Sequence, residues 1–361
     1  MLLVCLGATA GLRTAESELA ASLERVGASV TRVTAAPPRE VRTFMATDLS
    51  WALAARRAAA AGLAAGRPRA IVYSSTTAAL LWPRPGAIRF DALASETRPG
   101  RHGLWQRPVE ARRLQQAPLL VPWAPEALSR PSVVVPIPIE PSGPAETRNV
   151  AAMTYGAHWR KKGLDRVLAA WSMVAGRGAV PAAGASPGEL VVTGVDAARV
   201  AEAWTAGGGA GRLPVSVRVT GPLGRDAYRA LLRRARVFVT APRREDYGIA
   251  QLEALADGCT LVTTAAPGPY AALPLARALD PRLVVEDGDD IAGLARALQA
   301  ALTGTDECRA PMGVGGVDAH RHSTSSYAAR AAQAVAPFSR AAVDRVVAEE
   351  LLPRLLADRA V

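Results

Sequence analysis

Residues 244–259 read Arg-Glu-Asp-Tyr-Gly-Ile-Ala-Gln-Leu-Glu-Ala-Leu-Ala-Asp-Gly-Cys. Two acids in this stretch, Glu245 and Glu253, stand eight positions apart, and an apolar helical pattern runs between Gly248 and Gly258. Apolar, strand-like runs precede and follow it. The pattern predicts a strand, a loop that carries one acid, a helix that carries the second acid, and another buried strand.

This arrangement is suited to holding a nucleoside diphosphate. Gly248 allows the sharp turn at which the helix begins. The first helical N–H groups have no partner inside the helix and lie at the positive end of its dipole, so they form a site for a diphosphate. The carboxylates of Glu245 and Glu253 accept hydrogen bonds from sugar or ribose hydroxyls. The structural alternative is that an acid stabilises the helix start and Gly258 is an ordinary C-cap.

Length and composition limit the classes of protein that fit. A chain of 361 residues exceeds the size of one hydrophobic core, so we expect two domains. The net charge of +11 favours anionic partners: nucleotide diphosphates, phospholipid headgroups or nucleic acid. Cys5, Cys259 and Cys308 have no paired or metal-type spacing, which favours a reducing compartment. Because no apolar run approaches the ~18 residues of a membrane span, we expect a cytoplasmic protein, with contact to the inner face of the cell membrane left open.

Short apolar runs alternate with helical patterns along the chain, which predicts doubly wound parallel sheets. The Pro- and Gly-rich break at 140–144 is the best candidate linker. We therefore expect a first domain over 1–143, a second over 149–325, and C-terminal helices over 326–361 that return to the first domain. The last strand of the first domain is expected over 132–139.

The segment around the two acids resembles the nucleotide-sugar site of retaining GT-B glycosyltransferases, most closely the family-4 group (glycosyl transferases group 1). A second motif, Gly-Ala-His-Trp-Arg-Lys-Lys-Gly at 156–163, is similar to the loop in which that family places a Gly-Arg pair before a Lys-Gly turn. The resemblance covers 150–302 and is architectural only over the first half. It implies an α/β fold of the GT-B type, in which two Rossmann-like domains face each other across a cleft.

The resemblance implies a role for each matching residue. Lys162 and Glu245 would be catalytic, with Lys162 on the donor diphosphate and Glu245 on the transferred sugar. The other donor-binding candidates are Gly156, Arg160, Gly163, Tyr247, Gly248, Ile249 and Glu253, the last of these on the ribose hydroxyls. Ala157 stands where the family has its diphosphate arginine, and His158 or Arg160 is the candidate replacement. The acceptor-side candidates are Gly7, Asp91 and Arg98.

The activity that the resemblance implies is a retaining transfer of a sugar from a UDP- or GDP-sugar. The acceptor would be a glycan, a lipid-linked molecule or a small molecule in cell-envelope or polysaccharide biosynthesis. The leaving phosphate oxygen can take the acceptor proton, so neither a cofactor nor a metal is expected. The acidic run 287–290 is expected to cap a helix instead.

Two groups of arginines bear on the partners. Segment 98–107 mixes arginines with Leu104 and Trp105, as interfacial segments do, and suggests contact with anionic lipid. The alternative is a solvated basic loop. A second group has helical spacing and is expected on a solvated helix face: Arg225, Arg229, Arg233 and Arg234.

Other classes of function remain open. The missing arginine at Ala157 leaves room for a non-catalytic GT-B scaffold in an envelope-assembly complex. A hydrolase or epimerase on the same fold would use the same donor site. The net charge alone suggests a nucleic-acid-binding protein, but the basic residues are dispersed and lack interleaved aromatics. We therefore expect a nucleotide sugar, and no nucleic acid, as the partner.

Overall fold

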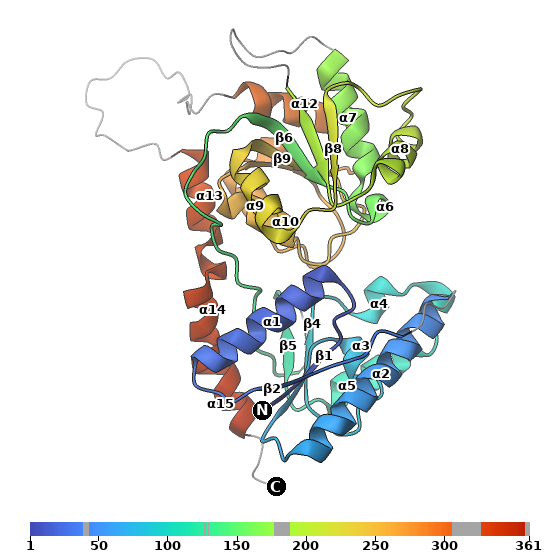
Figure 1. The fold of residues 1–361 in the computed structure, drawn as a ribbon, viewed down its shortest axis with the longest axis vertical. Coiled ribbons are helices and arrows are strands. Elements are labelled where there is room, and N and C mark those ends of the chain that lie inside the picture. The colour runs from blue at the N-terminus through green and yellow to red at the C-terminus, as the bar shows by residue number, and fades with distance from the viewer. Residues whose placement is uncertain (39–42, 126–127, 129, 177–187, 305–325, 358–361) are drawn as a thin grey trace, which may run out of the picture. The chain divides into compact units, whose positions relative to one another are not determined.

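The computed structural model describes residues 1–38, 43–125, 128, 130–176, 188–304 and 326–357 (Figure 1). The chain divides into two compact units, one of Met1–Pro138 with Pro337–Val361 and one of Ile139–Ala336. Each unit has its own parallel β-sheet. Residues 305–325 of the expected second domain, with Cys308, and residues 358–361 of the expected C-terminal helices lie outside the described residues.

The first unit contains a five-stranded parallel sheet in the order β2-β1-β3-β4-β5. Its strands are β1 (Leu2–Cys5), β2 (Thr31–Thr34), β3 (Ile71–Tyr73), β4 (Ala87–Phe90) and β5 (Leu120–Pro122). Strands β1, β3 and β4 are buried along their whole length, as expected where helices cover both faces of a parallel sheet. The strand order reverses between β1 and β3, so the loops after these two strands are where such sheets bind ligands.

The helices of the first unit are capped by side chains that the sequence provides. They are α1 (Ala10–Arg25), α2 (Phe44–Ala65), α3 (Thr76–Ala79), α4 (Ala94–Thr97), a 3-10 turn (Gly100–Gly103) and α5 (Gln106–Gln116). Thr9 caps α1 by accepting from the amide of Leu12, and Thr43 caps α2 by accepting from the amide of Ala46. Both are preferred N-cap residues because the side-chain oxygen satisfies an otherwise unpaired amide.

The C-terminal helices of the first unit pack on α1. They are α14 (Arg340–Val346), a π-helical turn (Val347–Leu351) and α15 (Leu352–Ala357). Their apolar side chains share one cluster with Leu19 and Leu23 of α1. Asp344 on α14 accepts hydrogen bonds from Ser22 Oγ at 2.5 Å and from Arg25 Nε at 2.6 Å. An ion pair and an apolar face together therefore fix the end of the chain to α1.

The expected strand over 132–139 is wrong. A single bridge joins Leu120 to Ser132, and the amides of Val133 and Val135 donate to Leu120 and Pro122 of β5. The segment is extended, but prolines at 136 and 138 have no N–H to continue the ladder. The apolar sequence pattern predicted an extended backbone correctly, but the prolines prevent this segment from pairing as a strand.

The second unit contains a six-stranded parallel sheet in the order β11-β10-β9-β6-β7-β8. Its strands are β6 (Val150–Tyr155), β7 (Leu190–Thr193), β8 (Val217–Gly221), β9 (Ala235–Thr240), β10 (Thr260–Thr264) and β11 (Val284–Val285). Numbered within the unit, this is the Rossmann order, and it reverses between β6 and β9. The loops after β6 and β9 therefore border the ligand-binding edge of the sheet, and both carry residues of the two sequence motifs.

The helices of the second unit cover both faces of its sheet (Figure 1). They are α6 (Trp159–Lys162), α7 (Leu164–Gly176), α8 (Ala197–Ala206), α9 (Arg225–Arg234), α10 (Ile249–Ala256), α11 (Ala272–Leu279), a 3-10 turn (Pro281–Leu283), α12 (Ile291–Thr303), α13 (Tyr327–Val335) and a 3-10 turn (Ala336–Phe338) that begins at the unit boundary. Asp290 caps α12 by accepting from the amide of Gly293 at 2.7 Å, as expected for the acidic run.

Helix α13 belongs to the second unit, whereas the sequence assigned all of 326–361 to helices that return to the first. The hydroxyl of Tyr327 accepts from the amide of Leu261 in β10 at 3.2 Å, and Ala331 and Val335 are buried. These contacts hold α13 on the second sheet's helical layer. Within the described part of the chain, no helix combines the length and the apolar character that crossing a membrane requires.

Candidate active site

Two loops meet at the switch point of the second sheet. One follows β6 and begins at Gly156, and the other follows β9 and begins at Ala241. Gly156 is buried, and a Cβ there would lie 2.7 Å from a methyl of Val195 and 3.0 Å from one of Leu164. Since both contacts are too short for a Cβ atom, only glycine at this position lets the first loop pack against Val195 and Leu164.

The two loops touch at Gly163, which has φ +63°. A Cβ on Gly163 would lie 1.7 Å from the carbonyl oxygen of Ala241, so the backbones approach as closely as glycine permits. The amide of Arg243 donates to the carbonyl of Lys161 at 2.9 Å. The Arg243 guanidinium also donates hydrogen bonds to both carboxylate oxygens of Asp165, at 2.6 and 2.8 Å. This set of contacts fixes the two loops against each other.

An ion pair across these loops joins Lys162 to Glu245. The Lys162 ammonium donates to Glu245 Oε2 at 2.6 Å. Gln251 Nε2, on α10, donates to the same oxygen at 3.0 Å. Glu245 is 4% exposed, whereas the Lys162 side chain is 20% exposed and reaches solvent. The structure therefore brings both predicted catalytic residues together, with the cation on the accessible side of the pair.

A third loop supports the backbone of Glu245. The Glu245 amide donates to the carbonyl of Pro267 at 3.1 Å. Gly268 has φ +112°, and a Cβ there would lie 2.2 Å from the Glu245 carbonyl oxygen. The hydroxyl of buried Tyr270 lies 2.6 Å from Thr263 Oγ1, and burial raises the pKa of this phenol. The loop after β10 thus forms a rigid support behind the predicted catalytic acid.

Helix α10 begins at Gly248, which has φ +93° and so adopts the left-handed conformation that favours glycine. Tyr247 is buried, and its carbonyl accepts from the amide of Ala271 at 2.9 Å. Ile249 is half-buried at the first helical position. The amide of Leu252 is the first to bond back to Gly248, so the amides before it are those that a helix start offers to an anion.

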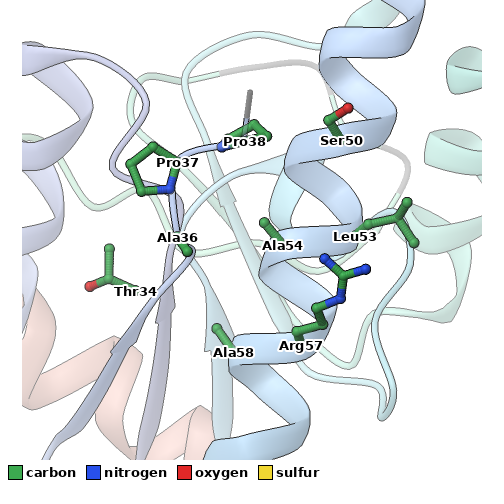
Figure 2. Close-up of a pocket in the computed structure, with 9 residues that line it drawn as sticks. All are labelled: Thr34, Ala36, Pro37, Pro38, Ser50, Leu53, Ala54, Arg57 and Ala58. Carbon is green, nitrogen blue, oxygen red and sulfur yellow. The ribbon is translucent and has the colours of Figure 1, made fainter. Parts of the chain in front are cut away.

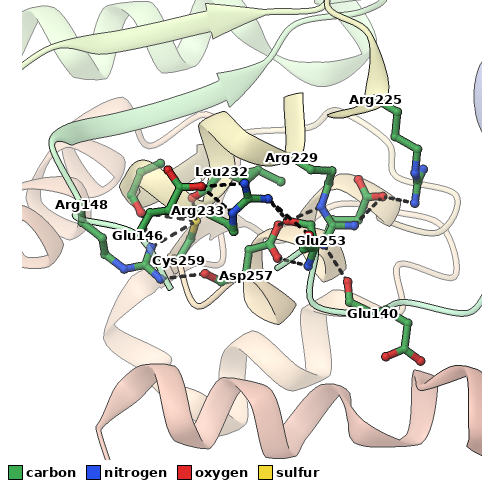
Figure 3. Close-up of polar contacts among 12 residues, drawn as sticks. Glu140, Glu146, Arg148, Arg225, Arg229, Leu232, Arg233, Glu253, Asp257 and Cys259 are labelled. Carbon is green, nitrogen blue, oxygen red and sulfur yellow. Dashed lines mark hydrogen bonds and ion pairs between the residues drawn. The ribbon is translucent and has the colours of Figure 1, made fainter. Parts of the chain in front are cut away.

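Glu253 lies in a different polar network from Glu245 (Figure 3). Its Oε1 is 3.2 Å from Arg229 Nη1 and 3.1 Å from Arg225 Nη2. Glu253 is 4% exposed, and burial raises the pKa of its carboxyl in spite of the two arginines. The expectation that Arg229 lies on a solvated face is wrong, since it is 5% exposed. Arg225, by contrast, has a side chain that is 54% exposed.

The candidate replacements for the missing arginine do not sit at the Lys162–Glu245 pair. Arg160 is exposed, and its guanidinium lies over the Trp159 ring at 4.6 Å from the ring centroid. The Arg160 carbonyl accepts from Arg243 Nη1 at 2.9 Å. His158 is exposed, with φ +53° at the start of α6. Arg160 therefore contributes its backbone to the junction of the two loops, while its cation stacks on an aromatic ring.

The acceptor-side candidates lie at three separate places in the first unit. Gly7 follows β1 with φ +66°, and its amide donates to Oε1 of buried Glu16 at 3.1 Å. Asp91 directly follows β4 and is half-buried. Arg98 is engaged with Asp48 of α2 through two hydrogen bonds of 2.7 and 3.0 Å. Gly7 is thus at the switch point of its sheet, whereas the charge of Arg98 is already neutralised.

Sequence reasoning missed two contributors to the site. Gln251 was read only as part of an apolar helix, yet it bonds Glu245. The second contributor is Arg229, which pairs with both Glu253 and Asp257. The available signal was charge spacing: arginines stand four apart in α9, and acids stand four apart in α10 and at its C-cap, so the two rows can pair.

The fold of the chain is similar to that of several solved structures. A sucrose-phosphate synthase from Thermosynechococcus elongatus superposes with a TM-score of 0.71 at 15% identity, covering 99% of this chain and 98% of that one. WaaG, a glycosyltransferase involved in lipopolysaccharide biosynthesis, gives a TM-score of 0.62 at 15% identity, with 98% and 97% covered. The pneumococcal O-GlcNAc transferase GtfA, solved with UDP and GlcNAc, gives 0.54 at 11% identity, with 80% and 57% covered. No curated protein sequence matches the chain.

These likenesses define the class: the chain has the GT-B fold of two Rossmann-like, parallel-sheet units. Within it, residues 150–304 match the sequence model described as Glycosyl transferases group 1. That region lies within the second unit and is similar to group 1 glycosyltransferases, and the family match and the fold together support transferase activity. The matched range contains both loops, the Lys162–Glu245 pair and Glu253.

Proposed function

We propose that this protein transfers a sugar, with retention of anomeric configuration, from a UDP- or GDP-sugar to a hydroxyl-bearing acceptor. The observation that carries the proposal is the Lys162–Glu245 pair of 2.6 Å at the switch point of the second sheet. Its cation is the more exposed partner, and Gln251 in the first turn of α10 donates to the same oxygen of Glu245. That combination suits a diphosphate leaving group, whose developing charge both elements stabilise.

The proposed roles follow from what each group can do. Lys162 and the α10 amides hold the diphosphate, and Glu245 lies one contact away, where its carboxylate orients the hydroxyls of the transferred sugar. Glu253 accepts from the ribose. Gly156, Gly163 and Gly248 let the backbone that would line the donor pack closely against its own neighbours in the protein. In a same-face transfer, the leaving phosphate oxygen takes the acceptor proton, so positioning and charge suffice for catalysis.

Two measurements test the donor half of the proposal. Calorimetry with UDP and GDP should detect nucleotide binding, and Glu253→Ala should weaken it about 10-fold or more because charge-assisted bonds to the ribose are lost. Glu245→Ala should reduce turnover of UDP-glucose or GDP-mannose more than it reduces nucleotide affinity. If both variants behave like the unaltered protein in both assays, the assignment of this site is wrong.

The reaction itself separates the alternatives. UDP-glucose and GDP-mannose should release nucleoside diphosphate faster when an alkyl glycoside or a sugar phosphate is added as acceptor. Acceptor-independent release with free sugar would indicate a hydrolase, and donor isomerisation an epimerase. Nucleotide binding with no chemistry on either donor would favour a non-catalytic scaffold. Proton NMR of the new anomeric centre tests retention directly, and an inverted product would contradict it.

We also propose that α2 brings the first unit to an anionic membrane surface. Its exposed apolar side chains Met45, Leu49 and Leu53 are spaced four residues apart and form one stripe along the helix. Arg57 follows one turn later and borders a hollow of about 540 Å³ beside the stripe (Figure 2). Exposed Leu104 follows the 3-10 turn that packs on α2. Apolar side chains beside basic ones suit the interface of an anionic bilayer.

Vesicle flotation tests this surface. The protein should float with vesicles that contain phosphatidylglycerol but not with pure phosphatidylcholine, and the association should weaken at high salt. A Leu49→Ser/Leu53→Ser variant should lose most of the binding. Val215→Ser is the matched control, because Val215 is an exposed large apolar residue of the other unit. Equal flotation of the double variant, or none for the unaltered protein, would contradict the membrane proposal and leave the donor site unaffected.

A further inference from the structure

A buried arginine behind Glu253 holds several groups at once (Figure 3). We propose that Arg229 is a positioning residue for donor binding: it fixes Glu253 for the ribose and ties that carboxylate to the segment that enters the second unit. This inference rests on the proposed function, since it assumes that Glu253 contacts the donor. It concerns a residue outside both sequence motifs, on helix α9.

The contacts of Arg229 run in three directions. Its Nη1 donates to Glu253 Oε1 at 3.2 Å, its Nε to Asp257 Oδ2 at 2.8 Å, and its Nη2 to the carbonyl of Glu140 at 2.7 Å. The side chain is 6% exposed and that of Asp257 is 0% exposed. A rigid, planar guanidinium with several donors can hold three partners in fixed directions, which a lysine ammonium on a flexible stem does less well.

The network leaves one oxygen of Glu253 open. Both arginines approach Oε1, and among the described residues Oε2 has no hydrogen bond or ion pair. One oxygen is thus anchored, and the other is the one that we assign to a ribose hydroxyl. Because Arg229 is buried and held at its far side by Asp257, it is the fixed anchor, whereas half-exposed Arg225 contributes only a screened charge.

The same network reaches the chain segment at 140–142. Asp257 accepts from the amide of Ser142 at 2.7 Å and from its hydroxyl at 3.0 Å. With the Glu140 carbonyl on Arg229, both polar residues of this proline-containing segment are hydrogen-bonded to the Arg229–Asp257 pair. Fixing Glu253 by donor binding therefore also restrains Arg229, Asp257 and the Ser142 amide. That amide should exchange with solvent more slowly when a donor nucleotide is bound.

A matched control is available on the same helix. Arg233, one turn after Arg229, donates to Ser142 Oγ at 2.8 Å and pairs with Glu146 at 2.6 Å. It therefore shares the contact with the 140–146 segment but has no contact with Glu253 among its described bonds. A purely structural role for these arginines predicts similar consequences for both. A positioning role predicts an effect on nucleotide affinity for Arg229 alone.

The experiment is calorimetry with UDP and GDP on the full chain, combined with thermal unfolding and amide exchange at Ser142. Arg229→Met should weaken nucleotide binding about 10- to 100-fold, the size of one lost charge-assisted bond, and Arg229→Lys should recover part of it. Arg233→Met should change the affinity by less than about twofold. In a Glu253→Ala background, Arg229→Met should have little further effect, since the two residues act as one unit.

The outcomes distinguish the two proposals. If Glu253→Ala weakens binding but Arg229→Met does not, or if Arg229→Met costs the same with and without Glu253, the positioning role is wrong and the proposed function stands. If Glu253→Ala leaves binding of both nucleotides unchanged, the proposed donor site itself fails. Should Arg229→Met not fold, Asp257→Asn replaces it: this change frees the far side of Arg229 and should still weaken nucleotide binding and speed exchange at Ser142.

Discussion

The Lys162 ammonium lies 2.6 Å from Glu245 Oε2, although 83 residues separate them in the chain. Lys162 ends the short helix α6 directly before Gly163, and Glu245 stands on a loop that packs against Gly268. The backbone therefore holds Lys162 and Glu245 close enough for their side chains to pair. Such preorganised charge is what a departing diphosphate requires.

Removing the cation should affect turnover most. Lys162→Met should lower turnover of UDP-glucose or GDP-mannose about 10²- to 10³-fold, the usual cost of one group that stabilises transition-state charge. It also leaves buried Glu245 without its cation, so the melting temperature should fall. Lys161→Met, which removes the neighbouring ammonium that pairs with Asp246, is the control. Equal losses of turnover in the two variants would argue against a specific role for Lys162.

Glycine at position 163 should contribute strongly to the stability of the second unit. Gly163→Ala places a Cβ 1.7 Å from the Ala241 carbonyl oxygen at φ +63°, so we expect a loss of about 2–4 kcal/mol in the free energy of unfolding. Gly176 is the last residue of α7, the helix that begins directly after Gly163. A Cβ at this position would meet nothing within 4 Å, so Gly176→Ala should be neutral or slightly stabilising. Chemical denaturation measures both, and a Gly163→Ala variant as stable as Gly176→Ala would refute the close approach.

Much of the second unit could be predicted from sequence because its signals are local. Strand runs, the glycine before α10 and the acids 245 and 253 lie within one short segment, and each has a physical reason to be there. The charge networks were harder to predict from sequence, because the pairing of charged side chains depends on which helix faces meet. Arg229 looks like any surface arginine in sequence, yet it is buried and pairs with Glu253 of α10 and with Asp257 at the end of that helix. The first unit carries no such motif, and its acceptor candidates were assigned by position alone.

The C-terminal anchor should show its own pH dependence. The hydrogen bond from Arg25 lowers the pKa of Asp344 below its ordinary value. Its stabilising effect is therefore fully present above the unfolded pKa of about 3.9 and is lost as the pH falls through the lower folded value. Asp344→Asn should cost about 1 kcal/mol at neutral pH, because the pair is only partly buried.

Thermal unfolding between pH 7 and pH 3 tests the Asp344 pair. The difference in melting temperature between the unaltered protein and Asp344→Asn should shrink at the acid end. Glu286→Gln is the control, because its partner Arg277 and Glu286 itself are both exposed, at 44% and 65% of their side chains, and this change should have almost no effect. A difference for Asp344→Asn that stays constant with pH would contradict the linkage.

Glu253 should give two pH effects of opposite sign. Burial raises the pKa of its carboxyl, so the folded protein takes up this proton at a higher pH than the unfolded chain. Its contribution to stability is thus present below the unfolded pKa of about 4.3 and is lost as the pH rises through the raised folded value. Donor binding follows the opposite course, because a protonated carboxyl is a weaker acceptor for ribose hydroxyls.

Glu253→Gln isolates both effects, since the amide has nearly the same shape and no charge to titrate. As the pH falls from 7 towards the unfolded pKa of about 4.3, the affinity for UDP-glucose, whose phosphates stay ionised, should fall more for the unaltered protein than for Glu253→Gln. Over the same range, the melting temperature of the unaltered protein should rise relative to the variant. Both trends must come from one titration, so their midpoints should agree. A fall in affinity without the matching gain in stability would mean that another group titrates at the donor site.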